Sequence, residues 1–417
     1  MFTHLRTLPI VLGLVAGASF ILSLPVSASS SPNDPYFTNG SQWYLNGLNG
    51  IAAPQAWCVS TGSGILIADI DSGADFSHPD LQGQLIPGVA YLGHLGLQTG
   101  SGINALIDDA NHGTETAGIL AAQANNNEGI SGIAPNAKVL VIKVADSQGG
   151  VSQLDEAAGI RYAVDHGAKV LNLSLPPVGL EKGGAIYNSM QYALSKGAMP
   201  VIAADNFSAD WSVGGNVEKT SHQILVVGAT GIDGAITSYS GRGAGVNVYA
   251  PGGELQNVPQ SDSIISTASL KTGYAYNYEA GTSEATPMVS GVMALLMAKG
   301  YSASEARYRL LSSTVSKNGL PTLNAARALG STAQCPLSGY TQPFWNQTVE
   351  FLGLYNLPSL DTLDLPSINL SNLFLFFDFS TFLFCTTLLA RSYLVPYLEK
   401  RKVTFIGITQ PVEVKEV

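Results

Sequence analysis

Residues 279–291 spell EAGTSEATPMVSG, and the interpretation of the other segments depends on this one. Thr282 and Ser283 stand where a helix should begin, and Pro287 lies early enough in that helix to be tolerated. An apolar run through Met297 follows, so we predict a buried helix with a serine at its N-terminal end. Free N–H groups at such an end would stabilise negative charge on a bound carbonyl oxygen. Ser283 is therefore a candidate nucleophile, and an ordinary N-cap is the alternative.

Composition limits the class of protein. The chain has 417 residues, 45 of them glycine, and its 46% hydrophobic content suits a well-buried α/β core. Only 12% of the residues are charged and the net charge is −10, which argues against nucleic acid as a partner. The three cysteines are too few for a disulfide scaffold and lack metal-ligand spacing.

The N-terminal residues 1–28 are typical of a secretory signal peptide. A short apolar run follows two basic side chains, and small residues precede a cleavage point after Ala28. The run is short for a membrane span, so an uncleaved anchor is the less favoured alternative. We expect the remaining chain to be exported, to an extracellular or periplasmic location.

From Gly64 onward, short apolar runs alternate with helical patterns. Several runs are apolar on both faces, as in a parallel sheet covered by helices on both sides. We therefore predict an open, doubly wound α/β sheet, whose functional groups gather beyond the C-terminal ends of its strands. The predicted strands are 65–70, 139–144, 170–175, 199–204, 224–228 and 246–249, and the predicted helices are 112–122, 153–166, 186–196, the one after Ser283, and 303–311.

Four polar residues in four segments should meet at that edge of the sheet. Asp71 ends the first strand, His112 opens a helix, and Asn206 follows a strand. With Ser283 they supply a carboxylate, an imidazole, an amide and a hydroxyl. A serine is a poor nucleophile until an imidazole takes its proton, and a buried carboxylate fixes the imidazole tautomer. Singly, each residue could be a turn, cap or loop residue, but their joint occurrence predicts a Ser-His-Asp site with Asn206 as oxyanion donor.

The chain order Asp, His, Ser and six short motifs resemble the subtilisin-like serine peptidases, most closely the thermitase-like branch. The resemblance covers about residues 33–330. It implies a mainly parallel seven-stranded sheet and an endopeptidase that cleaves polypeptide substrates through an acyl-enzyme. The matching motifs are DSG at 71–73, HGT at 112–114, GIAP at 132–135, NLSL at 172–175, APG at 250–252 and GTS-x-ATP at 281–287.

The same resemblance implies where the substrate and a structural ion bind. Substrate-binding positions correspond to Ser174, Leu175, Pro176, Ala203 and Asp205. The family commonly carries calcium between its N-terminal segment and a loop, and hard oxygen donors suit that ion. The matching side chains are Asp34, Asp80 and Asn126, with the backbone carbonyls of Ala124, Glu128 and Ile130; a simple polar turn at 125–127 is the alternative.

Some residues depart from the family pattern. Pro176 has no N–H for the substrate ladder, and Asp205 replaces a glycine at the pocket for the side chain before the cut bond. Asp205 should either select Lys or Arg there or crowd the pocket. Beside the site, Glu115 replaces the histidine and Glu284 the methionine that are usual in the family. We predict that these two glutamates are neighbours that share a proton or a hydrogen bond. In the alternative, both glutamates point into polar surroundings.

The C-terminal part leaves the family pattern. Residues 331–372 read as a linker rich in Pro, Leu, Ser and Asn. Residues 373–390 form an apolar stretch long enough to span a membrane as a helix, and the basic-flanked tail 391–417 would stay on the cytoplasmic side. Asp378 opposes insertion, by about 2.5–3.5 kcal/mol, so a segment that packs on a partner is the alternative. We predict a peptidase domain tethered by this helix.

Further expectations concern maturation, disulfide pairing and turnover. The family-like start at Asn33 follows the signal almost at once, so we expect no inhibitory pro-segment. A Cys58–Cys335 disulfide would close a long loop in an oxidising compartment, and two separate thiols are the alternative. We expect a monomeric peptidase domain. The competing function is a catalytically weak protein that keeps the fold and binds polypeptide without efficient turnover.

Overall fold

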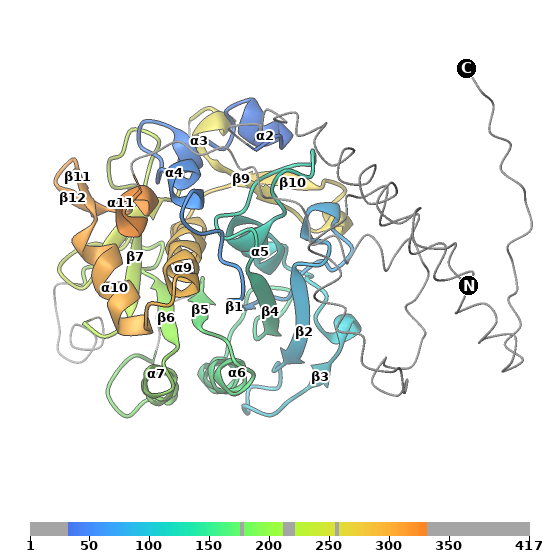
Figure 1. Ribbon diagram of the computed structural model, residues 1–417. Coiled ribbons are helices and arrows are strands. Elements are labelled where there is room, and N and C mark those ends of the chain that lie inside the picture. The colour runs from blue at the N-terminus through green and yellow to red at the C-terminus, as the bar shows by residue number, and fades with distance from the viewer. Residues whose placement is uncertain (1–31, 176–178, 212–221, 255–257, 332–417) are drawn as a thin grey trace, which may run out of the picture. The chain divides into compact units, whose positions relative to one another are not determined.

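The structure is a computed structural model that describes residues 32–175, 179–211, 222–254 and 258–331 (Figure 1). Its centre is a ten-stranded sheet with the strand order β11-β12-β8-β7-β6-β5-β1-β4-β2-β3. Seven adjacent strands run parallel, which agrees with the predicted architecture. They are β8 (Val248–Pro251), β7 (Leu225–Thr230), β6 (Met199–Ala203), β5 (Val170–Leu173), β1 (Leu66–Asp71), β4 (Lys138–Lys143) and β2 (Leu85–Ala90).

Shorter strands complete the sheets. β3 (Gly100–Ser101) pairs antiparallel with β2, β12 (Leu320–Thr322) joins β8 through a single residue pair, and β11 (Val315–Lys317) closes a hairpin with β12. β9 (Ile264–Thr267) and β10 (Tyr276–Glu279) form a separate antiparallel pair. The parallel core is thus widened at both of its edges.

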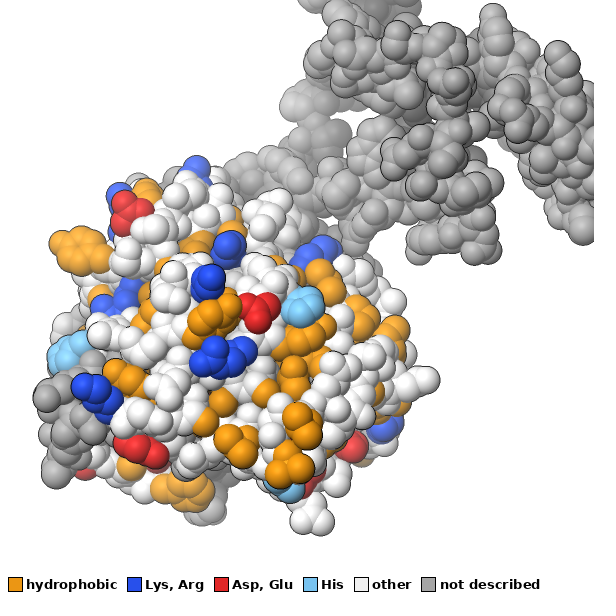
Figure 2. Space-filling model, turned by 90° about the horizontal axis from the view of Figure 1, so that it is seen from below, with side chains coloured by type: hydrophobic (Ala, Val, Ile, Leu, Met, Phe, Trp, Pro, Cys, Tyr) orange, Lys and Arg blue, Asp and Glu red, His pale blue; other side chains and the backbone are white. Residues whose placement is uncertain are grey.

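Helices cover both faces of the parallel core (Figure 1). α5 (His112–Ala121), α9 (Thr282–Ala298) and α10 (Ala303–Ser312) belong to the first apolar cluster, and α6 (Gln153–Asp165) and α7 (Ala185–Ser195) pack in the second, on the opposite face. On the face covered by α6 and α7, basic and acidic side chains are interspersed with hydrophobic side chains (Figure 2). The five predicted helices therefore form, with bounds within one or two residues of those expected.

Short helices lie outside the sheet and the helices that cover it. α2 (Pro35–Thr38), α3 (Trp43–Asn46) and α4 (Ala53–Trp57) precede β1, and α11 (Ala325–Leu329) lies near the C-terminal end of the described part. Single 3-10 turns occur at η1 (Pro79–Leu81), η2 (Ile103–Ala105), η3 (Gln260–Asp262) and η4 (Leu270–Thr272).

Several predictions fall outside the described residues. The signal peptide, Pro176, the linker 331–372, the apolar segment 373–390 and the tail lie there, apart from Ser331. Within the described ranges, no helix combines the length and the apolar character needed to cross a bilayer. Cys58 is disulfide-bonded, and both other cysteines of the chain lie outside the described residues, so Cys335 as its partner stays a prediction.

Candidate active site

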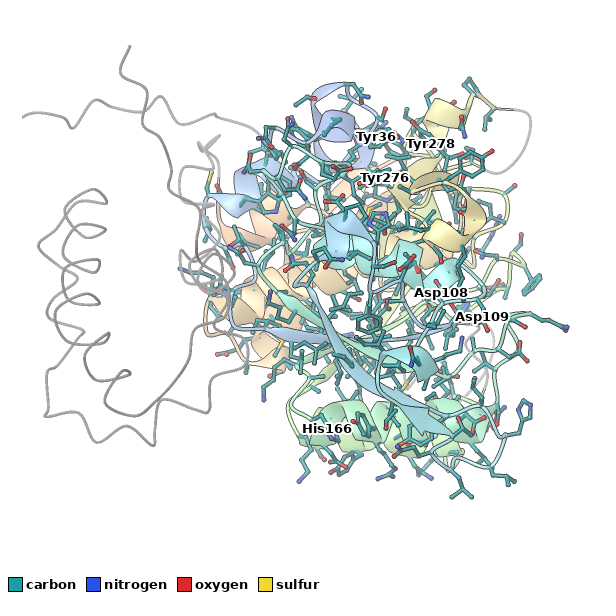
Figure 3. All side chains as sticks on the ribbon, turned by 90° about the vertical axis from the view of Figure 1, so that its right-hand side faces the viewer. Tyr36, Asp108, Asp109, His166, Tyr276 and Tyr278 are labelled. Atoms are coloured by element: carbon teal, nitrogen blue, oxygen red, sulfur yellow. The ribbon has the colours of Figure 1, made fainter. Side chains whose placement is uncertain are left out.

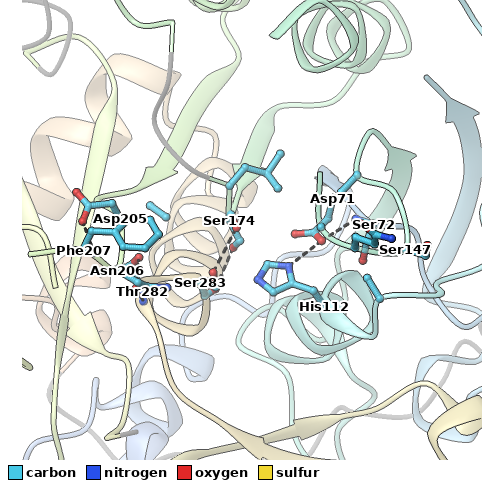
Figure 4. Close-up of a pocket in the computed structure, with 16 residues that line it drawn as sticks. Asp71, Ser72, His112, Ser147, Ser174, Asp205, Asn206, Phe207, Thr282 and Ser283 are labelled. Atoms are coloured by element: carbon cyan, nitrogen blue, oxygen red, sulfur yellow. Dashed lines mark hydrogen bonds and ion pairs between the residues drawn. The ribbon is translucent and has the colours of Figure 1, made fainter. Parts of the chain in front are cut away.

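The fold brings the four predicted polar residues to one edge of the sheet. Asp71 is the last residue of β1, His112 is the first of α5, and Ser283 is the second of α9. Asn206 follows the end of β6. These residues line one pocket beyond the C-terminal ends of the parallel strands, which is where a doubly wound sheet binds ligands (Figure 4).

Asp71 and His112 form a hydrogen-bonded pair. Oδ1 of Asp71 lies 2.8 Å from Nδ1 of His112 and accepts a second bond of 2.6 Å from the backbone N–H of Ser72. The carboxylate is buried, whereas a third of the imidazole surface, 33%, is exposed to the pocket side. Because Nδ1 is directed at an acceptor, this arrangement favours the tautomer with its proton on Nδ1 and a free lone pair on Nε2.

A glycine permits the approach of α5 to the end of β1. A Cβ atom on Gly113 would lie only 2.1 Å from the carbonyl oxygen of Gly73, so a side chain at this position would force the helix away. The residue after His112 is therefore required to be glycine for the Asp71–His112 distance to persist. This is the physical reason for the His-Gly order in the predicted motif.

Ser283 is not an N-cap of α9. The cap position is Gly281, and Ser283 lies inside the first turn. Its hydroxyl is 3.3 Å from the carbonyl oxygen of Ser174, and its own carbonyl accepts a 2.9 Å hydrogen bond from the Ser174 hydroxyl. In Figure 4 the His112 ring lies between Asp71 and Ser283, although no hydrogen bond joins Ser283 to His112 in the described structure. The position of Ser283 therefore contradicts the alternative in which it serves only as the N-cap of α9.

Asn206 caps α9 from another segment. Its Oδ1 accepts bonds from the backbone N–H of Thr282, at 2.8 Å, and from the Thr282 hydroxyl, at 2.9 Å. Since a backbone N–H can only donate, this contact fixes the orientation of the amide. Nδ2 remains as a donor beside Gly281, two residues from the candidate nucleophile.

The predicted substrate positions lie in the same pocket, with one outside the described residues. Ser174, Leu175, Ala203 and Asp205 line it, and Pro176 is not described. Further lining residues come from the loop after β4 and from the start of α9, and these include Ser147, Gln148, Gly149 and Thr282. The prediction named none of the residues 147–149, because a polar turn carries no local signal of its partners.

Asp205 is directed at its own loop. Its Oδ1 accepts bonds from the backbone of Phe207, at 2.7 Å, and Ala209, at 3.3 Å, and its Oδ2 lies 3.3 Å from Nε1 of Trp211. The backbone is left-handed here, with φ of 81°, which a glycine would adopt more easily. Its carboxylate oxygens are therefore engaged by the loop, which disfavours the alternative in which Asp205 selects Lys or Arg.

Residues 62–331 match the profile of the subtilase family, which is more than half of the chain. The chain belongs to the subtilase family.

Curated relatives agree with this membership. The chain is 37% identical over 283 residues to thermitase of Thermoactinomyces vulgaris, covering 66% of this chain and 89% of that protein. It is 37% identical over 284 residues to a thermophilic serine proteinase of a Bacillus species, covering 67% of this chain and 63% of that protein. Thermitase-like peptidases are thus similar proteins, and this subtilase is a subtilisin-like serine peptidase.

Solved structures of peptidases share the fold. A protease from Pseudoalteromonas arctica is 28% identical, with a TM-score of 0.62, and the similarity covers 72% of this chain and 99% of that one. The nisin leader peptidase NisP from Lactococcus lactis is 25% identical with a TM-score of 0.56, covering 71% of this chain and 95% of that one.

In this subtilase, carboxylates surround the imidazole. Burial opposes the charged form of His112, but the Asp71 charge and hydrogen bond, followed by Glu284 and Glu115, outweigh burial and raise its pKa. Burial and the charges of Glu284 and Glu279 raise the pKa of Glu115. Glu115 and Glu284 are thus electrostatic neighbours, as predicted. No hydrogen bond joins them in the described structure, where Asn111 donates to Glu115, so a shared proton stays a prediction.

The predicted calcium ligands also come together. Asp34 and Asp80 are fully buried. Asn126 joins them, because its N–H donates to Asp34 at 3.1 Å and its Nδ2 donates to Asp80 at 2.8 Å. The loop that carries the carbonyls of Ala124, Glu128 and Ile130 also donates from its backbone to both carboxylates, at Asn125 and Ile130.

The carboxylate, amide and carbonyl oxygens of these residues are of the kind that calcium binds. Within the described chain, neither Asp34 nor Asp80 forms an ion pair with a basic side chain, and buried carboxylates need a cation or many donors. The described residues contain no cluster of three or more His, Cys, Asp or Glu suited to a metal. An ion here would therefore depend on the amide and backbone oxygens as well, which is the ligand type that calcium accepts.

Two buried aspartates near the site were missed by the sequence prediction. Asp108 accepts hydrogen bonds from Ser72, next to Asp71, and from Thr114 in the first turn of α5. Asp69 lies two residues before Asp71, and 2% of it is exposed. A charged residue inside an otherwise apolar buried strand was the available signal for Asp69; nothing local indicates the role of Asp108.

Proposed function

We propose that this subtilase is a serine endopeptidase that cleaves polypeptides with Ser283 as nucleophile, His112 as general base and Asp71 as the residue that orients His112. The observation that supports this most directly is the 2.8 Å Asp71–His112 pair, which lies in the pocket that Ser283 also lines. A carboxylate, an imidazole and a hydroxyl in this order are sufficient for acyl transfer.

The reaction follows from these positions. Nε2 of His112 removes the Ser283 proton as Oγ attacks the substrate carbonyl carbon. Asp71 stabilises the imidazolium that forms, and His112 then donates the proton to the leaving amine. Nδ2 of Asn206 and the N-terminal end of α9 stabilise the oxyanion, each in a position fixed before substrate arrives. A water activated by His112 releases the acyl group from Ser283.

Covalent labelling tests this assignment. The full-length protein should react with a fluorophosphonate probe at Ser283, and peptide mapping should place the label there. Ser283→Ala should abolish labelling and lower kcat by about 10³-fold or more, while Ser195→Ala, at an exposed serine of α7 outside the pocket, should keep both. Labelling that persists in Ser283→Ala would reject the assigned nucleophile.

Binding without efficient turnover is the second candidate. Two observations favour it: Ser283 bonds to Ser174 rather than to His112, and the Asp205 carboxylate is engaged by its own loop. Apo sites often carry loose catalytic hydrogen bonds, so we favour the peptidase. A wild-type protein that binds denatured casein yet shows no label at Ser283 would reverse this choice.

The proposed function includes a bound structural calcium ion and export of the protein to the outer side of a membrane. The ion would be held by Asp34, Asp80, Asn126 and carbonyls of 124–130, and it would supply charge neutralisation to two buried carboxylates. Residues 1–28 and 373–390, outside the described part, support export and a membrane tether. Release of the full-length protein by carbonate extraction would reject the tether.

A further inference from the structure

Asp69 is a buried carboxyl group to which the proposed reaction gives no role. It lies on β1 two residues before Asp71, so strand alternation places both side chains on the same face of the sheet. Ile67, which shares that face, packs in the cluster formed with α5 and α9. Asp69 therefore lies directly behind the residue that orients His112, on the side where both helices of the site pack.

Both oxygens of Asp69 have hydrogen-bond partners. Oδ1 accepts a 2.9 Å bond from Nδ2 of Asn172, which is its register partner on β5. Oδ2 lies 2.8 Å from Oγ1 of Thr116, one helical turn beyond His112 on α5. The carboxyl group thus connects the central strand to its neighbour and to the helix that carries the imidazole.

Counting protons indicates the protonation state of Asp69. Oγ1 of Thr116 lies 2.8 Å from Oδ2 of Asp69 and 3.1 Å from the carbonyl oxygen of Gly113. A hydroxyl has one proton and a carbonyl has none, so Thr116 can donate to only one of these two acceptors. If Asp69 carries a proton on Oδ2, it donates to Thr116, and Thr116 donates to Gly113. The contacts of Thr116 with Asp69 and with Gly113 can therefore both be hydrogen bonds only if Asp69 is the neutral acid.

The network extends from Asp69 to the nucleophile. Oδ1 of Asn172 accepts a 2.8 Å bond from Ser290 on α9, and Nδ2 lies 3.2 Å from the hydroxyl of Ser174. That hydroxyl donates to the carbonyl of Ser283 at 2.9 Å. One set of hydrogen bonds therefore connects the backbone of Ser283 with the first turn of α5, where Gly113 follows His112.

The charges around Asp69 also favour the neutral form. Burial and the Asp71 charge raise the pKa of Asp69 to about 8, against the lowering effect of Asn172, Thr116 and His112. Among the leading causes of this shift, the titratable groups are Asp71 on its own strand and His112 on α5. β5 and α9 present uncharged amide and hydroxyl groups to this network, and the register partner on β4 is Val141.

We propose that Asp69 is a positioning residue that acts as a neutral carboxylic acid, donating its proton to Thr116 and so fixing the turn of α5 that carries His112. The inference rests on the proposed peptidase function. Neutral Asp69 leaves Asp71 as the ionised carboxylate on this face of β1. Loss of the proton would turn the Thr116 hydroxyl away from Gly113 and add a second buried negative charge behind His112.

Asp69→Asn is the decisive variant, because its Nδ2 donates as the protonated Oδ2 does and its Oδ1 still accepts from Asn172. At neutral pH its kcat/KM should stay within about threefold of wild type. Above about pH 8 the wild type should lose activity as Asp69 ionises, whereas Asp69→Asn should not. Loss of more than about tenfold at neutral pH, or an unchanged alkaline limb, would overturn the proposal.

Substitutions of Thr116 provide a matched control pair. Thr116→Val removes the hydroxyl but keeps the shape, and it should lower kcat about tenfold with little change in KM, because His112 is misplaced rather than substrate binding lost. Thr116→Ser keeps the hydroxyl and should restore kcat. Equal kcat in the valine and serine variants would contradict the role given to this hydrogen bond.

A stability measurement separates this inference from the peptidase assignment. In the Ser283→Ala background, an acid whose pKa is raised on folding loses stabilisation as pH rises from its unfolded value, about 3.9, to its folded value, about 8. The Tm advantage of Asp69→Asn should therefore grow across that window, and a constant difference would reject a neutral Asp69. If the fluorophosphonate probe does not label Ser283 of the wild type, both the peptidase assignment and this inference are rejected. If Ser283 is labelled but the Tm difference between Asp69→Asn and its parent is constant with pH, only the inference about Asp69 is rejected.

Discussion

Glu284 is buried directly after Ser283 and acts on the imidazole through its charge. Burial raises its pKa to about 7, against the opposing effect of His112. In turn its charge contributes to the raised pKa of His112, where burial acts in the opposite direction and Asp71 has the larger raising effect. Glu115 on α5 and Glu279 on β10 are the other glutamates in this group. The charge on each of these two groups, Glu284 and His112, therefore shifts the pKa of the other.

Removal of this charge should move the acid limb of kcat/KM to lower pH. His112 must be neutral to accept the Ser283 proton, and a nearby carboxylate keeps it protonated to higher pH. Glu284→Gln and Glu284→Met should both shift the limb downward, on the order of one pH unit. Glu181→Gln, at an exposed position, serves as the control. A pH–rate profile of Glu284→Met that overlies that of wild type would reject the coupling.

Residues with a local signature could be predicted from the sequence, and residues defined by distant partners could not. Asp71, His112 and Ser283 each stand in a short motif at the end of a strand or the start of a helix. Asp69 depends on Asn172, 103 positions away, and Asp108 on Ser72, 36 positions away. Neither contact follows from hydrophobic periodicity, because periodicity indicates the face of an element but not its neighbour.

At the scale of elements, α5 begins without a cap of its own. Asn111 occupies the cap position with φ of 70° and makes no side-chain cap bond. Asp108, labelled beside Asp109 in Figure 3, replaces it: Oδ2 accepts from the backbone and hydroxyl of Thr114 at 2.8 and 2.6 Å. Oδ1 accepts from Ser72 at 2.8 Å. One carboxylate thus connects the start of the helix to the end of β1.

Asp108→Asn should weaken this connection. An amide has one acceptor oxygen, so it can satisfy either the Thr114 donors or the Ser72 hydroxyl, and its NH2 group then faces a donor. We expect a loss of about 1–3 kcal/mol in the free energy of unfolding, measured by urea denaturation in the Ser283→Ala background. The exposed Asp165→Asn should change it by less than about 0.5 kcal/mol. Equal stabilities of the two variants would contradict the capping role.

Element prediction failed where local residues oppose the observed structure. Six parallel strands were predicted, but β2 was missed because Pro87 and Gly88 interrupt its apolar run. The structure explains why they are tolerated. β3 pairs with β2 only at Val89 and Ala90, so Pro87 lies where the outer edge is unpaired, and the register shifts between Pro87 and Val89. A Cβ on Gly88 would lie 2.4 Å from the Val141 carbonyl oxygen.

At the scale of the molecule, the described N-terminal segment is tied to the core by the loop 124–130. Tyr36 donates from its backbone to the carbonyl of Gly129 at 2.9 Å. Its ring packs on Tyr276 with centroids 5.1 Å apart, and both tyrosines are labelled in Figure 3. Tyr276 in turn lies 3.4 Å from Asp80. A calcium ion held by Asp34 and Asp80 would therefore connect three segments that are far apart in sequence.

Calcium removal should consequently destabilise the whole peptidase domain. With EGTA, the Ser283→Ala protein should unfold at lower temperature, and excess calcium, but not magnesium, should restore its Tm. At free calcium about 1,000-fold above Kd, linkage gives about 4 kcal/mol of stabilisation. Asp34→Asn should lose this response because it removes a charged ligand, whereas the exposed Asp233→Asn should keep it. Identical melting curves of the parent protein with EGTA and with calcium would show that the loop is held by its hydrogen bonds alone.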